Sequence, residues 1–223
     1  MNLSDLHRRL LADVLTIGTP YPLVITGGYA VQAHGLVQRL SQDLDVATEN
    51  PAPMDEIIRT VSAGLTDRGW AVRQIETDPL SGRLIVSDPT TGEECEVDIL
   101  KEAFWAPPAD TKFGLALSLD DVIGTKVRAL ADRSAVRDLI DVHAAAQHRT
   151  TADLESLGRR HARTDFSLHE LRDHLVGAEW WDDQDFYAYG ITSEHLADLR
   201  AWALAWAADL DTRLHVADDP DEY

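Results

Sequence analysis

The sequence predicts an α+β fold, with a mixed sheet and flanking helices in the first half of the chain and only helices in the second. Two observations support this. Short apolar runs alternate with stretches of helical spacing in the first half, whereas almost every segment after Ser118 has helical spacing. We therefore expect a sheet domain at 1–115, a helical domain at 116–215 and an acidic tail at 216–223.

The N-terminal half is expected to alternate helices and strands. Leu6, Leu10 and Val14 recur at helical steps, so a helix should begin near Asp5 with Ser4 as its N-cap. Further helices are expected at 29–36 and 54–65. Alternating apolar residues and turn signals predict strands at 21–26, 44–48, 70–77, 82–89 and 94–101. The proline-rich segment 103–114 is expected to be a loop.

The C-terminal half is expected to be a series of helices joined by short polar breaks. These are predicted at 119–133, 134–149, 151–163, 167–178 and 195–210. Trp202 and Trp206 are four residues apart in the last of them, so we interpret both as core residues. Trp180 and Trp181 lie in an acidic, loop-like stretch, where a protein contact or a cap suits them better than base stacking.

Composition limits the function classes. The 223 residues carry a formal net charge of −19, which argues against bulk nucleic-acid affinity but leaves room for a local basic patch such as Arg159, Arg160 and Arg163. Cys95 is the single cysteine, so an internal disulfide is excluded. No apolar run approaches the roughly 20 residues of a membrane span, so we expect no membrane partner and a cytoplasmic protein.

Two aspartates one residue apart form the first candidate site. In a strand, Asp43 and Asp45 would point to the same face with backbones about 7 Å apart, while Leu44 points into the core. Burying two like charges without a partner is costly, and a divalent cation between them removes the repulsion. Oxygen ligands suit Mg²⁺, or Mn²⁺ in its place. Asp98, which lies deeper in its apolar run than Glu96, is the expected third carboxylate.

Gly27 and Gly28 precede this pair at the end of an apolar run. Glycines let a backbone approach a ligand closely, and a helix that opens on them offers free N–H groups to a phosphate. Ser41, two residues before Asp43, would share its face and can donate a hydroxyl to phosphate. Metal and glycine turn could then hold one nucleoside triphosphate, an arrangement suited to phosphoryl or nucleotidyl transfer.

Two motifs together resemble the nucleotidyltransferase toxins of the AbiEii/AbiGii type, within the polymerase-β-like superfamily and type IV toxin–antitoxin systems. The first is Gly27-Gly28 followed by Arg39-Leu40-Ser41-Gln42-Asp43-Leu44-Asp45. The second is the segment at 126–141, in which Lys126, Ala129, Arg133, Arg137, Asp138 and Asp141 match the family pattern. The resemblance covers about 23–146, and the last third matches only in being helical.

The resemblance implies a nucleotidyltransferase fold whose helical domain completes the active-site cleft. It implies catalytic or metal-binding roles for Ser41, Asp43 and Asp45, and active-site roles for Lys126 and Asp138. Gly27, Gly28, Arg39, Ser41 and Lys126 would then bind the nucleoside triphosphate. The role of Asp98 as the third carboxylate is inferred mainly from its position in the predicted strand at 94–101. A structural charge network is an alternative interpretation of Arg133 and Arg137 beside Asp138 and Asp141.

The implied reaction is Mg²⁺-dependent transfer of a nucleoside monophosphate to an acceptor. In some members of the family the acceptor is the 3′ end of tRNA, and an antitoxin is often encoded beside the toxin. Two alternatives stay open. The acidic chain suits a small cationic acceptor such as an aminoglycoside, and the same fold can serve as a catalytically silent module that binds nucleotide or a partner. An intact Asp43–Asp45 pair argues against the silent module.

Overall fold

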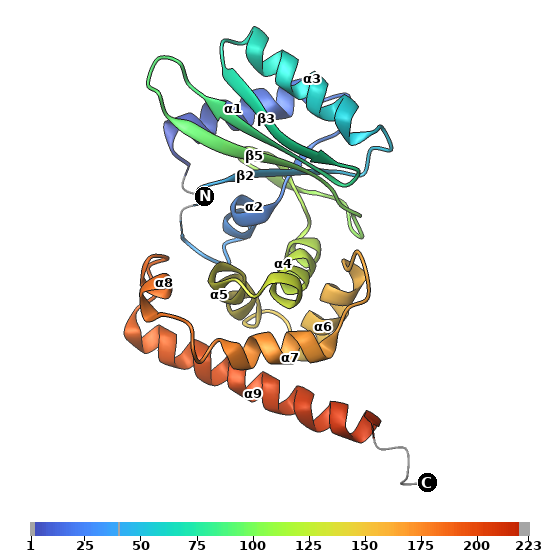
Figure 1. Ribbon diagram of the computed structural model, residues 1–223, viewed down its shortest axis with the longest axis vertical. Helices are drawn as coiled ribbons and strands as arrows, with labels where there is room; N and C mark the ends of the chain where they lie inside the picture. The colour runs from blue at the N-terminus through green and yellow to red at the C-terminus, as the bar shows by residue number, and fades with distance from the viewer. Residues whose placement is uncertain (1–2, 40, 219–223) are drawn as a thin grey trace. The chain divides into compact units, whose positions relative to one another are not determined.

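The computed structural model describes residues 3–39 and 41–218, and the chain divides into two compact units, Met1–Val122 and Ile123–Tyr223 (Figure 1). The first contains a mixed sheet with helices, and the described part of the second is helical. The predicted α+β fold is therefore confirmed. The boundary lies within helix α4 (Leu119–Arg133). The predicted acidic tail at 216–223 overlaps the end of helix α9, and its residues 219–223 lie outside the described residues.

The described part of the first unit forms a seven-stranded sheet in the order β3-β4-β5-β2-β1-β7-β6. β2 pairs in parallel with β5, and β1 with β7, whereas the other neighbours are antiparallel. The strands are β1 (Val24–Ile25), β2 (Leu44–Thr48), β3 (Ala71–Asp78), β4 (Ser81–Ser87), β5 (Glu94–Lys101), β6 (Ala109–Thr111) and β7 (Gly114–Ala116).

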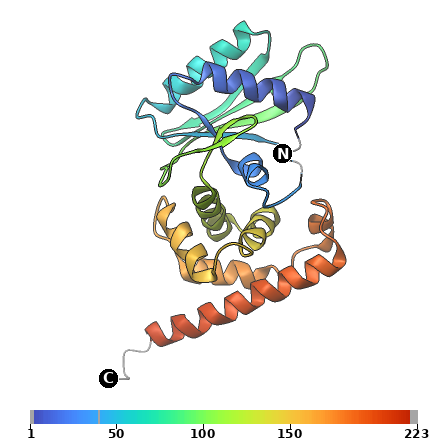
Figure 2. The ribbon, with the colours of Figure 1, turned by 180° about the vertical axis from the view of Figure 1, so that it is seen from behind.

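Helices α1 (Asp5–Ile17) and α3 (Met54–Asp67) lie together on one face of this sheet, and α2 (Gly27–Ala33) lies next to β2 (Figures 1 and 2). α1 begins as predicted, because the Ser4 side chain accepts a hydrogen bond from the backbone N–H of His7 at 3.1 Å. α1 and α3 approach closely, since a β-carbon on Gly64 would come 2.7 Å from Ile17. The apolar sides of both helices and of β2, β4 and β5 form the core.

The first unit differs from the sequence expectation at the segment 103–114, at α2 and at β1. The segment 103–114, expected to be a loop, contains β6 and enters β7, which extend the sheet beyond β1. α2 begins at Gly27 rather than at Tyr29 and ends at Ala33. β1 is only two residues long, because the chain enters α2 directly after it. Strands this short carry too few residues to show an alternating pattern.

The described part of the second unit consists of helices that pack on one another. α4 and α6 touch closely, because a β-carbon on Gly124 would come 2.4 Å from His161 and one on Gly158 would come 2.6 Å from Val127. α9 is longer than predicted, and α8 falls in a stretch expected to be irregular. The remaining helices are α5 (Val136–Ala145), α6 (Thr151–Arg160), α7 (Leu168–Gly177), α8 (Asp183–Tyr187) and α9 (Ser193–Asp218).

Of the two tryptophans expected in the core, Trp206 is buried and Trp202 is partly buried. Trp206 is buried in α9 and its indole N–H donates to Glu155 at 3.0 Å, and its ring lies 5.3 Å from that of Trp202. Trp180 is 81% exposed, whereas Trp181 stacks on Phe186 of α8. Trp206 is thus a core residue, as expected.

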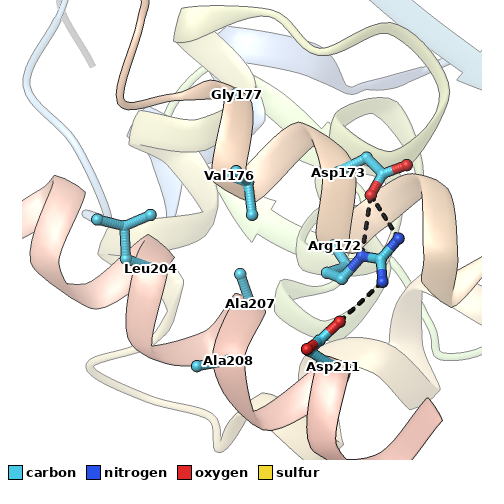
Figure 3. A pocket seen from close by; sticks show the side chains of 8 residues that line it. All are labelled: Arg172, Asp173, Val176, Gly177, Leu204, Ala207, Ala208 and Asp211. Atoms are coloured by element: carbon cyan, nitrogen blue, oxygen red, sulfur yellow. Dashed lines mark hydrogen bonds and ion pairs between the residues drawn. The ribbon is translucent and has the colours of Figure 1, made fainter. Parts of the chain in front are cut away.

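An open groove of about 590 Å³ lies between α7 and α9 (Figure 3). The side chains that line it are mostly small and apolar. At one end Arg172 forms ion pairs of 2.7 Å with Asp173 and 2.9 Å with Asp211. The lining contains none of the motif residues of the candidate active site. It is made by Arg172, Asp173, Val176, Gly177, Leu204, Ala207, Ala208 and Asp211.

Candidate active site

The turn between β1 and α2 places Gly27 against Asp45. The backbone N–H of Thr26 donates to the carbonyl of Asp45 at 3.0 Å, which holds the end of β1 beside β2. Gly27 has φ +57°, and a β-carbon there would come 1.9 Å from an Asp45 carboxylate oxygen. Only glycine satisfies both the left-handed backbone and the contact. Gly27 thus lets the backbone lie directly against the Asp45 side chain, while its predicted contact with a phosphate stays a prediction.

Gly28 lies under the side chains of the first motif. A β-carbon on Gly28 would come 2.5 Å from the hydroxyl oxygen of Ser41 and 3.6 Å from a guanidinium nitrogen of Arg39. Leu40, between them, lies outside the described residues. The first motif is thus assembled within one unit, with Arg39, Ser41 and Asp45 all close to the glycine pair.

The two aspartates flank the buried Leu44 at the start of β2, and both are partly exposed. The negative charge of Asp43 reaches three buried neighbours. Together with burial, which has the larger effect, it raises the pKa of Tyr29 and raises the pKa of the Cys95 thiol to about 12. Cys95 therefore stays protonated and is not a candidate nucleophile. Burial lowers the pKa of His7, and the negative charge of Asp43 opposes this shift.

Asp98, the expected third carboxylate, lies beside Asp45 and is held by an arginine. The parallel register of β2 and β5 pairs Asp45 with Asp98, and the antiparallel register of β4 and β5 pairs Asp98 with Arg83. Arg83 forms two parallel hydrogen bonds of 2.8 Å to the two oxygens of Asp98, and lies 3.3 Å from Glu96. The hydrogen bond to Asp98 raises the pKa of Arg83.

The donor set can be tested against the predicted cation. Among residues 3–39 and 41–218, no three His, Cys, Asp or Glu side chains gather into a metal site. Asp98 uses both oxygens on Arg83, although a carboxylate has about four lone-pair positions. Two carboxylates suit Mg²⁺, which takes its other ligands from water and phosphate. The residues at the Asp43–Asp45 pair therefore fit the cation, and the metal role of Asp43, Asp45 and Asp98 stays a prediction.

The second motif forms a buried ion cluster inside the second unit. Lys126 of α4 lies 2.9 Å from Asp141 and 3.3 Å from Asp138, both on α5. Arg133 adds hydrogen bonds of 2.7 Å and 3.1 Å to Asp138. Burial alone would raise the pKa of Asp138, but the charges of Lys126 and Arg133 hold it below its ordinary value. Ser134, with φ +56°, makes the sharp turn that brings the two helices together.

Several residues of the site were not singled out from the sequence. Tyr29 directly follows the glycine pair, but nothing in a single sequence shows that its hydroxyl turns back to the Ser41 carbonyl at 3.2 Å. The role of Arg83 depends on the register of a hairpin, which its sequence does not specify. His34 is the C-cap residue of α2, and its Nε2 lies 2.7 Å from the carbonyl oxygen of Leu117.

Within the described ranges, even the longest helix, α9, has too many polar residues to cross a membrane.

A mixed sheet that carries a glycine turn against an Asp-x-Asp pair is the arrangement that the two motifs predicted for a nucleotidyltransferase. Residues 9–212 match the family model of the AbiEii nucleotidyltransferase toxins of type IV toxin–antitoxin systems. The chain therefore belongs to this family of enzymes, as its two motifs predicted.

Solved structures share this fold at low sequence identity. JHP933 from Helicobacter pylori is 18% identical, with 97% of this chain and 98% of that chain covered and a TM-score of 0.55. MenT4, a nucleotidyltransferase toxin from Mycobacterium tuberculosis, is 17% identical, with 92% and 83% covered and a TM-score of 0.59. No curated protein matches the chain.

Proposed function

We propose that this chain transfers a nucleoside monophosphate from a nucleoside triphosphate to RNA, with the 3′ end of tRNA as the first acceptor to test, in a Mg²⁺-dependent reaction. One observation carries the proposal: the carboxylate of Asp45 lies against Gly27 while the hydroxyl of Ser41 lies against Gly28. The residues proposed to bind the cation and the phosphates would then act beside the same glycine turn.

Each residue of the turn has a proposed task. Asp43 and Asp45, with Asp98 beside them, would hold Mg²⁺ or Mn²⁺. When bound, the cation would lower the pKa of the acceptor hydroxyl and neutralise the leaving pyrophosphate. The Ser41 hydroxyl and the Arg39 guanidinium would donate to phosphate oxygens. Gly27 and Gly28 let the side chains of Asp45 and Ser41 lie directly against the backbone, where the triphosphate would bind.

Lys126 and Asp138 are proposed as further active-site residues because they match the second family motif. The ion pairs of 2.9 Å and 3.3 Å made by Lys126 also support the structural alternative. Measuring transfer in a variant that lacks Lys126 but has recovered its stability separates the two roles.

The acceptor and nucleotide can be identified in one experiment. The protein is incubated with each radiolabelled nucleoside triphosphate, Mg²⁺ and either total tRNA or an aminoglycoside. Label on RNA is the expected result. Label on the aminoglycoside alone would replace RNA by a small cationic acceptor, which the net charge of −19 favours. Nucleotide-induced thermal stabilisation without label on either acceptor would indicate a silent binding module instead.

The carboxylate roles are tested by variants of nearly unchanged shape. Asp43→Asn and Asp45→Asn each remove one negative charge, and we expect transfer to fall by at least about a hundredfold with the fold intact. Asp55→Asn is the matched control, because Asp55 is an exposed residue of α3 that forms an ion pair with the exposed Arg59. Loss of activity with EDTA and its return with Mg²⁺ or Mn²⁺ would support the cation. Wild-type turnover in Asp43→Asn would remove Asp43 from the mechanism.

Family membership also supports a cytoplasmic toxin that is neutralised by an antitoxin. Expression of the wild-type chain should then slow cell growth, and the Asp43→Asn variant should not. Equal growth defects in both would show that the toxicity does not come from nucleotidyl transfer.

A further inference from the structure

The segment that carries Ser41 and Asp43 is held by hydrogen bonds that connect it to Tyr29 of α2 and, through Tyr29, to His7 of α1. The phenol oxygen of Tyr29 lies 3.2 Å from the carbonyl oxygen of Ser41, and Nδ1 of His7 contacts the same phenol oxygen. Tyr29 is 1% exposed, and His7 is also buried. The rings of the two residues meet edge to face, with centroids 5.7 Å apart at 88°. Helix α1 is thereby connected to the motif segment through α2.

The direction of these hydrogen bonds follows from the number of hydrogens available. The carbonyl of Ser41 can only accept, so the single phenol hydrogen of Tyr29 must be donated to it. The phenol oxygen then accepts from His7, which must carry its hydrogen on Nδ1. Burial lowers the pKa of His7, and this keeps the ring neutral near pH 7. The series therefore runs from His7 through Tyr29 to Ser41.

We propose that Tyr29 and His7 are positioning residues, which fix the backbone at Ser41 so that the Ser41 hydroxyl is held against Gly28 and Asp43 is held at the start of β2. This inference rests on the proposed function for its effect on transfer. Neither residue is placed against the substrate. Their role is carried by the backbone carbonyl of Ser41, which accepts the hydrogen bond from Tyr29.

The test uses Tyr29→Phe, which removes only the phenol oxygen. We expect kcat to fall by about tenfold, with KM for the nucleoside triphosphate changed by less than about twofold, because the substrate contacts stay while the geometry loosens. His7→Leu should have the same effect. The kcat of the double variant should be no lower than that of the less active single variant, since the two residues act in series.

Tyr21→Phe is the matched control. Tyr21 is also a buried tyrosine of the first unit, and its hydroxyl bonds Glu56 at 3.2 Å and Thr60 at 3.0 Å, on α3. This variant should lose stability to a similar degree and keep its kcat. Equal kcat in Tyr29→Phe and Tyr21→Phe would overturn the positioning role.

Amide hydrogen exchange gives a second measurement that does not depend on activity. Peptides that span 39–45 should exchange faster in Tyr29→Phe than in the wild type and in Tyr21→Phe. Absence of transfer by the wild-type protein would contradict the proposed function, while faster exchange would still support the positioning of the segment. Unchanged exchange in Tyr29→Phe would contradict the inference even if the wild-type protein is active.

Discussion

The Asp45 carboxylate lies so close to Gly27 that a β-carbon on the glycine would come 1.9 Å from one oxygen and 2.4 Å from the carboxyl carbon. We predict that Gly27→Ala moves Asp45 and lowers transfer by about a hundredfold or more, because displacement of a reacting group by about 1 Å can have that effect. Transfer rate and thermal unfolding of the purified variant measure the two consequences.

Gly92→Ala is the control for backbone strain. Gly92 has φ +73° but no atom within 4 Å of its ideal β-carbon. Alanine there should reduce the free energy of unfolding by about 1–2 kcal/mol and leave transfer unchanged. If Gly27→Ala behaves in the same way as Gly92→Ala, the contact with Asp45 has no part in the activity.

The neighbouring contact between Gly28 and Ser41 predicts coupling in stability. A β-carbon on Gly28 would come 2.5 Å from the Ser41 hydroxyl oxygen and 3.1 Å from its β-carbon. Gly28→Ala should therefore destabilise the protein, and adding Ser41→Gly should recover about 1 kcal/mol relative to the sum of the single variants. Denaturant unfolding of all four proteins measures the cycle. Strictly additive effects would mean that the two side chains do not meet in solution.

These contacts show why part of the site could be predicted from the sequence. A left-handed glycine and a charge-repulsive Asp-x-Asp pair each need an unusual environment, so they are visible as local patterns. Arg83 is not, because it meets Asp98 only through the register of β4 and β5. A shift of one residue would turn Arg83 to the other face of the sheet.

The fold was predictable to a similar extent. Helices α1 and α3 bury one continuous apolar side and have clear starts, so their spacing is sufficient to identify them. β6 and β7 have three residues each, and their burial does not alternate clearly, so the segment 103–114 resembled a loop. Pairing with β1 stabilises β7, and this is a long-range effect that local propensity does not contain.

The ion cluster of the second unit predicts a large effect on stability. Lys126→Met removes the ammonium group that lies 2.9 Å from Asp141 and 3.3 Å from Asp138, and both aspartates are buried. We expect the free energy of unfolding to fall by about 3–5 kcal/mol, as for other broken buried pairs. Arg59→Gln, in the exposed Arg59–Asp55 pair, should cost less than about 1 kcal/mol. Denaturant unfolding compares the two.

A double variant then separates structure from catalysis. Lys126→Met with Asp141→Leu replaces an ion pair by apolar side chains, which should restore much of the stability. If Lys126 acts on the nucleotide as proposed, transfer should stay low in this restored protein. Recovery of transfer together with stability would show that Lys126 is structural, and would remove it from the active site.

The pH dependence of stability should report His143. Its ring lies 5.0 Å from that of Trp202, and its pKa is lowered from 6.5 first by burial and then by His195, while Asp198 opposes the shift. Above pH 6.5 the ring is neutral in the folded and unfolded chains alike. Below pH 6.5 the unfolded chain binds this proton more readily than the folded chain does. The stability that comes from keeping His143 neutral is therefore lost as the pH falls through the lowered pKa of the folded protein.

We therefore predict that His143→Gln flattens the fall of the unfolding temperature between about pH 7 and pH 5, because glutamine takes up no proton in that range. His148→Gln is the control, since His148 is an exposed histidine of the same unit. The difference between the wild-type and variant curves removes the contribution of the remaining histidines, including His7. Parallel curves for the wild type and His143→Gln would mean that protonation of His143 does not oppose folding.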